Sequence, residues 1–137
     1  MEAFKKKGSS PNPISKEEMS FGLVWVKKFS EALPNGLVAK IKDLKITVVG
    51  IGGILSISVK NQVQKKEKET YSVQDIKEKL TARLGLKDEQ IGGKFADTEI
   101  SNLILVLGLM ERFQISKVEP VVASNVDGIL VHPDFWK

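Results

Sequence analysis

Residues 99–113 read EISNLILVLGLMERF, and this segment constrains the fold more than any other. Its apolar residues recur at helical spacing on almost every side: Ile100, Leu103, Ile104, Val106, Leu107, Leu109, Met110 and Phe113. A helix that is apolar nearly all round is normally central in a fold or covered by a partner. The sequence therefore predicts a helix over 99–113, and Met110 and Phe113 are candidate contacts to a protein partner.

A second helix is predicted immediately upstream, over 73–84. Its apolar residues repeat on one face at a spacing of three and four: Val73, Ile76, Leu80 and Leu84. Ser72 is a good N-cap, and Gly85 supplies the backbone freedom with which many helices end. A glycine-containing loop over 87–94 follows, and either Asp97 or Thr98 is expected to cap the helix of residues 99–113.

A C-terminal β-hairpin is predicted next, because segments 118–126 and 129–131 flank Asp127-Gly128, a strong turn signal. The order of helix, loop, helix and hairpin resembles a winged helix-turn-helix, in which a recognition helix precedes a two-stranded wing. However, Arg112 is the only cation in the supposed recognition helix, and residues 71–137 carry a net charge of −2. Phosphate binding requires clustered positive charge, so the resemblance favours a protein-docking module over DNA readout.

An amphipathic helix is predicted near the N-terminus, where Ser15 opens a capping box. Phe21, Trp25 and Phe29 recur every four residues, which indicates that they share the apolar face. We therefore expect Trp25 to lie in the core. The helix is expected to end at the proline and glycine of residues 34–36.

A central β-hairpin is predicted from two short apolar segments, 46–49 and 54–59, joined by the glycine-rich residues 50–53. This stretch also resembles the opening of a dinucleotide-binding βα unit, but Leu55 stands where that pattern has its third glycine. The unit also requires a helix where 54–59 alternates as a strand does. The hairpin is therefore favoured and no cofactor is expected, while a ligand role for the turn is left open.

Length and composition indicate a single α+β domain. The chain has 137 residues, 42% of them hydrophobic and 28% charged, which are values close to globular averages. We expect a flexible basic tail over 1–14 and one globular domain over 15–137. The longest apolar run, 46–59, has 14 residues, whereas a membrane span needs about 20, so no span is expected.

The residue types that carry most metal and nucleophile chemistry are scarce. The chain has no cysteine, which excludes disulfides, thiolate zinc sites and a cysteine nucleophile, and which fits a cytoplasmic location. His132 is the single histidine and precedes Pro133, a position typical of a structural role. Zinc needs several ligands, so no metal site is expected, and no enzymatic activity is expected either.

Positive charge is concentrated in the first half, where residues 1–70 hold 13 lysines, no arginine and 7 acidic residues. Such lysines could converge on a surface that binds phosphates or other anions. The candidates are Lys5, Lys6, Lys7, Lys65, Lys66 and Lys68. The alternative is an ordinary solvated surface, because lysine lacks the bidentate geometry of arginine.

Phe135 and Trp136 either lock the chain end onto the body or anchor a partner, since such residues are frequent in interface hot spots. Together with the helix of residues 99–113, they favour a non-enzymatic interaction or assembly protein. Such a protein would be a small subunit of a larger complex or of a self-assembling particle. The alternative is a small nucleic-acid-binding or regulatory protein that uses its lysine-rich half.

Overall fold

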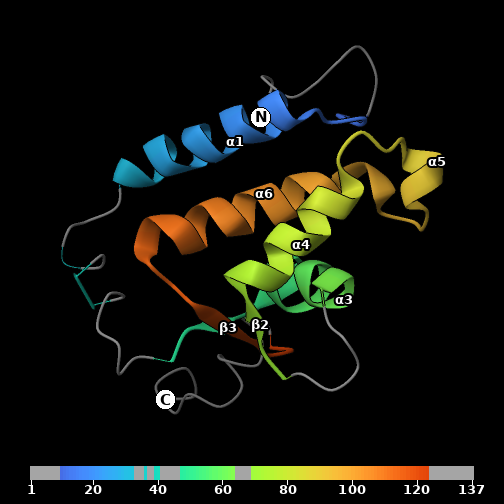
Figure 1. Cartoon of the computed structure of the whole chain (residues 1–137). Coiled ribbons are helices and arrows are strands. Elements are labelled where there is room, and N and C mark those ends of the chain that lie inside the picture. The colour runs from blue at the N-terminus through green and yellow to red at the C-terminus, as the bar shows by residue number, and fades with distance from the viewer. Residues whose placement is uncertain (1–9, 33–35, 37–38, 41–46, 64–68, 124–137) are drawn as a thin grey trace, which may run out of the picture.

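The computed structural model describes residues 10–32, 36, 39–40, 47–63 and 69–123 (Figure 1). Their elements follow the order α1 (Lys16–Phe29), η2 (Ser30–Ala32), β1 (Val49–Gly50), η3 (Gly53–Val59), α3 (Lys60–Val63), β2 (Tyr71–Ser72), α4 (Val73–Arg83), α5 (Asp88–Ile91), α6 (Ala96–Phe113) and β3 (Lys117–Pro120). Helices and a three-stranded sheet occur together, so the α+β class is confirmed.

Helix α6 is the centre of the described structure, as its composition predicted. Of its 18 residues only Thr98 is exposed, and α1 and α4 pack against it (Figure 1). The helix begins at Ala96, earlier than a cap at Asp97 or Thr98 would allow. The reason is that the carbonyl of Phe95 already accepts the backbone N–H groups of Thr98 and Glu99, at 3.0 and 3.1 Å.

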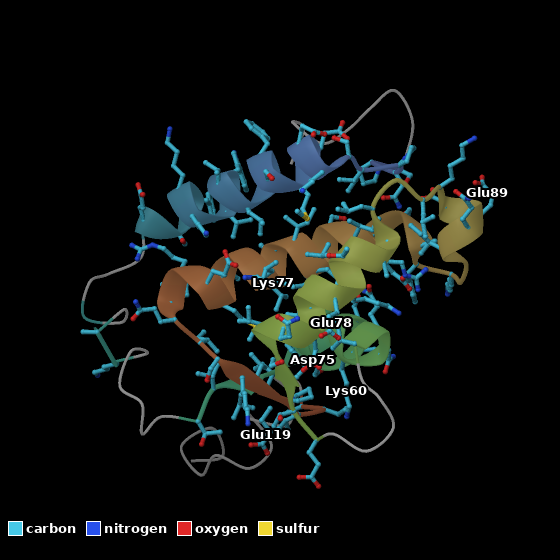
Figure 2. The ribbon with its side chains drawn as sticks, in the orientation of Figure 1. Lys60, Asp75, Lys77, Glu78, Glu89 and Glu119 are labelled. Atoms are coloured by element: carbon cyan, nitrogen blue, oxygen red, sulfur yellow. The ribbon has the colours of Figure 1, made fainter. Side chains whose placement is uncertain are left out.

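Helix α1 approaches α6 at a position without a side chain. A Cβ atom added at Gly108 would lie 2.7 Å from Cγ1 and 2.8 Å from Cβ of Val26, so the two backbones pack at close range. Glu111, one turn further along α6, accepts from the ammonium groups of Lys27 of α1 and Lys77 of α4, each at 2.8 Å. Figure 2 labels Lys77 on α4. These two hydrogen bonds lower the pKa of the Glu111 carboxyl and tie three helices together.

The N-cap predicted at Ser72 is confirmed, and the structure shows that it forms part of a capping box with Asp75. Ser72 Oγ accepts the N–H of Asp75 at 3.2 Å, and an Asp75 carboxylate oxygen accepts the N–H of Ser72 at 2.8 Å. The helix ends at Arg83, with Leu84 at the C-cap, and Gly85 follows with a φ of 76°. The short strand before it, β2, pairs antiparallel with β3, which is the central strand in the order β1-β3-β2.

The predicted central β-hairpin is wrong. Residues 53–59 form the π-helical turn η3 and continue into α3, and β1 pairs parallel with β3 instead of with a neighbouring strand. Inside η3 the Ser56 hydroxyl donates to the carbonyl of Gly52 at 2.7 Å, while Ser56 and Val59 are buried. The two buried residues are three positions apart, which is helical spacing, and they do not follow the alternation of serine with an apolar residue that suggested a strand.

The structure describes only part of the predicted C-terminal hairpin and part of the predicted N-terminal tail. β3 covers only the start of the first arm predicted over 118–126, since residues 121–123 are not part of a strand. Asp127-Gly128 and the second arm fall outside the described residues, so that hairpin stays a prediction. Residues 10–14 belong to the packed body and not to a tail. Ile14 is buried, and the Asn12 amide donates to the Asp88 carboxylate at 2.7 Å and to the Ala96 carbonyl at 3.0 Å.

We predict that Gly108→Ala destabilises the protein, although alanine is the better helix former. Overpacking costs about 1–3 kcal/mol, which exceeds a helix-propensity gain of about 1 kcal/mol. The matched control is Gly53→Ala, because a Cβ at Gly53 meets no atom within 4 Å. Urea denaturation should rank Gly108→Ala below wild type and Gly53→Ala at or above it. Equal stability of the two variants would contradict the close approach of α1.

A second prediction concerns Tyr71, the single tyrosine of the chain, which is 1% exposed and donates to the Leu55 carbonyl at 3.1 Å. Burial raises the pKa of Tyr71 to about 12. The unfolded chain loses this proton near pH 10, so the free energy of unfolding should fall by about 2–3 kcal/mol between pH 10 and pH 12. Tyrosinate absorbance should give a midpoint near 12 in buffer and near 10 in denaturant. A midpoint of 10 in both would refute the burial of this hydroxyl.

Candidate functional site

The residues predicted to bind a partner or an anion divide into two groups. Phe135 and Trp136 and all six candidate lysines, namely Lys5, Lys6, Lys7, Lys65, Lys66 and Lys68, lie outside the described residues, so their roles stay predictions. Met110 and Phe113 are described and are 2% and 5% exposed. Both side chains are buried in the core and expose almost no surface to a partner.

The exposed apolar surface lies instead on α1. Phe21, Val24, Trp25 and Phe29 are 55%, 64%, 38% and 70% exposed, and the rings of Trp25 and Phe29 stack with centroids 5.4 Å apart. We call these four residues the α1 outer face. The expectation that Trp25 lies in the core, with Phe21 and Phe29 on the same buried face, is therefore wrong.

The reason lies on the opposite side of α1, which carries smaller residues. Gly22, Val26 and Ser30 are buried there, and Met19 and Leu23 are partly buried against the core. Small side chains permit the close approach to Gly108, which indole and phenyl rings would prevent. The signal available in the sequence was this second apolar stripe, and the larger aromatic stripe obscured it.

Charges lie at both ends of the α1 outer face. Glu17 stands in the first turn, where a backbone hydrogen bond and one from Ser15 lower the pKa of its carboxyl. Lys28 stands in the last turn and is exposed, whereas Lys27 beside it is engaged with Glu111. The helix therefore presents an apolar strip with an acidic end and a basic end.

A cavity of about 490 Å³ is the second candidate site. It lies between the η3–α3 segment, helix α4 and the first turns of α6. Its lining combines apolar, amide, hydroxyl and charged side chains: Ile54, Ile57, Phe95, Asn61, Gln62, Asn102, Ser58, Thr98, Lys79, Arg83 and Glu99, with Gly53 at one edge. Gly53 belongs to the glycine turn whose ligand role the sequence left open, and the other residues were not singled out as a site, because they come from three segments that only the fold brings together.

The polar wall of this cavity is joined by hydrogen bonds. The side-chain amides of Gln62 and Asn102 both donate to Ser58 Oγ, at 3.2 and 3.0 Å, and link α3 and α6 to η3. Arg83 donates to the Ile91 carbonyl at 2.8 Å and lies 3.5 Å from a Glu99 carboxylate oxygen. That Glu99 oxygen and Gln62 Oε1 are buried and accept no hydrogen bond, so the Arg83–Glu99 contact is an ion pair of loose geometry.

The charges of the cavity do not cancel. Lys79 and Arg83 stand one turn apart on α4, and both line the cavity together with the single carboxylate of Glu99. Arg83 forms an ion pair with Glu99, whereas Lys79 forms no ion pair within the part of the chain that the structure describes. One cationic charge is left over at the cavity wall.

Among the described residues, no group of three or more histidine and acidic side chains is placed to hold a metal ion, and no helix has the length and apolar character to cross a membrane. No protein-family model, no curated protein and no solved structure matches the chain.

Proposed function

We propose that this chain is a non-enzymatic assembly protein that associates with further copies of itself through the α1 outer face. The observation that supports this proposal is the exposure of Val24, Trp25 and Phe29 on a helix whose other side already completes the core. Large exposed apolar side chains grouped on one face are typical of interaction surfaces. Trp25 and Phe29 are also pre-organised by their stacking, which reduces the entropy lost on binding.

A second copy is the occupant that the charges of α1 favour. If two α1 helices pack antiparallel about a two-fold axis, the acidic first turn of each lies beside the basic last turn of the other. Glu17 of one copy then approaches Lys28 of its partner at both ends of the contact, while the aromatic rings meet between them. Such an isologous contact needs one self-complementary surface, which is the commonest way in which soluble proteins form dimers.

The contact is expected to be weak on its own. A standard interface buries about 800 Å² on each partner, more than four side chains on one 14-residue helix can supply. We therefore expect a dissociation constant weaker than roughly 1 µM. Further contacts from other parts of the chain, including Phe135 and Trp136, would be needed for a larger particle.

The prediction is a concentration-dependent mass that depends on the α1 outer face. Sedimentation equilibrium between about 10 µM and 1 mM covers the affinities expected for such a contact. Trp25→Ser combined with Phe29→Ser should abolish association without unfolding the protein, because both side chains are exposed. Val122→Ser is the matched control, since Val122 is 79% exposed but lies beyond β3. A strictly monomeric wild type up to 1 mM would overturn the proposal.

Charge reversal tests the antiparallel arrangement separately. Glu17→Lys and Lys28→Glu should each weaken association by placing like charges together, and the double variant should restore it. Circular dichroism should confirm that α1 remains helical in all three variants. Association that persists unchanged in every α1 variant would move the interface elsewhere. Trp136→Ala in the same assay would then test whether that residue carries it.

A further inference from the structure

We propose that the cavity between η3, α4 and α6 binds a small monoanion with an apolar body, of the class of aryl- or alkyl-substituted carboxylates. This binding site is separate from the α1 outer face and does not depend on assembly. The inference rests on three properties of the cavity: its size, its uncompensated positive charge and its division into an apolar wall and a polar wall that includes the donors Ser58 and Lys79.

The size of the cavity fits a small organic molecule. Its volume of about 490 Å³ falls inside the range of roughly 300–1,000 Å³ that is usual for small-molecule sites. Ile54, Ile57 and Phe95 form the apolar wall and are 40%, 50% and 61% exposed. A bound hydrocarbon or aromatic group would cover these side chains and remove apolar surface from water.

The charge of the cavity selects the ligand class. Lys79 and Arg83 contribute two positive charges and Glu99 one negative charge, which leaves one positive charge. Arg83 lies 3.5 Å from the Glu99 carboxylate, and Lys79 forms no ion pair with any described residue, so the ammonium group of Lys79 is the cation available to a ligand. A lysine ammonium can turn three donors toward a carboxylate. A monoanion would therefore neutralise the cavity, whereas a cation would meet Lys79 and Arg83 at short range.

Ser58 adds a neutral donor at the boundary between the two walls. Its oxygen accepts hydrogen bonds from both Gln62 and Asn102, which occupies both lone pairs. Within the described part of the chain the Ser58 hydroxyl donates to no acceptor, so its proton is available to one carboxylate oxygen. The donor arrangement thus suits a carboxylate at Ser58 and Lys79, with its apolar body against Ile54 and Ile57.

The test uses three ligands with nearly the same skeleton: 3-phenylpropionate, phenylalanine and 3-phenylpropan-1-ol. The first is a monoanion, the second adds an ammonium group, and the third is neutral. Amide chemical-shift titrations should show saturable binding of 3-phenylpropionate, with a dissociation constant of roughly 0.1–1 mM as expected for so small a ligand. The shifts should map to η3, α4 and the start of α6. The zwitterion and the alcohol should each bind at least about tenfold more weakly.

Variants of the cavity separate specific binding from a general effect of charge. Lys79→Gln should weaken binding of 3-phenylpropionate about five- to tenfold, and Ile57→Ser should also weaken it. Both side chains are at least partly exposed, so folding should persist. Lys117→Gln, on β3, is the matched control and should leave binding unchanged.

The proposal is overturned if 3-phenylpropionate produces no saturable shifts up to about 10 mM. It is equally overturned if Lys79→Gln binds as wild type, or if phenylalanine binds more tightly than 3-phenylpropionate. Because none of these substitutions lies on α1, failure of the cavity and failure of self-association are observed independently.

Discussion

The packing of α1 on α6 depends on the close approach of Val26 to Gly108, where no further carbon atom fits between the two helices. This contact determines which side of α1 faces the core, because only the side with Gly22, Val26 and Ser30 is small enough to meet α6 at that distance. The aromatic residues of α1 are therefore directed outward, although they are its largest apolar side chains. The α1 outer face is therefore exposed because the contact between Val26 and Gly108 determines how α1 packs on α6.

The pairing of β1 with β3 likewise constrains the conformation of residues 53–59. β1 pairs with β3, some seventy residues away, and Gly50 lies so close to Val118 that an added Cβ would come within 2.7 Å of its side chain. With β1 paired in this way, the residues after the glycines turn into a helix and not back into a second strand. The placement of η3 beside α4 and α6 then forms the cavity, so this site also originates from a distant contact.

The two candidate sites use charge differently. On α1, an acidic end and a basic end are the basis for the antiparallel contact that we propose with a second copy. In the cavity, the pairing of Arg83 with Glu99 leaves Lys79 as the available cation. Glu111 shows the opposite situation, since two lysines from different helices satisfy one carboxylate and hold the bundle together. Ion pairing inside the structure thus decides which charges are available to a ligand or a partner.

The sequence by itself determined the helices whose signals are local. The all-round apolar composition of residues 99–113 placed α6 at the centre, and the capping box at Ser15 and the N-cap at Ser72 marked the starts of α1 and α4. Caps and apolar periodicity depend on neighbours within four residues, so they can be read along the chain. Only the tertiary structure decided the orientation of α1, the helical conformation of residues 53–59 and the composition of the cavity. These features depend on contacts between distant segments, and short-range periodicity carries no information about how closely two backbones approach.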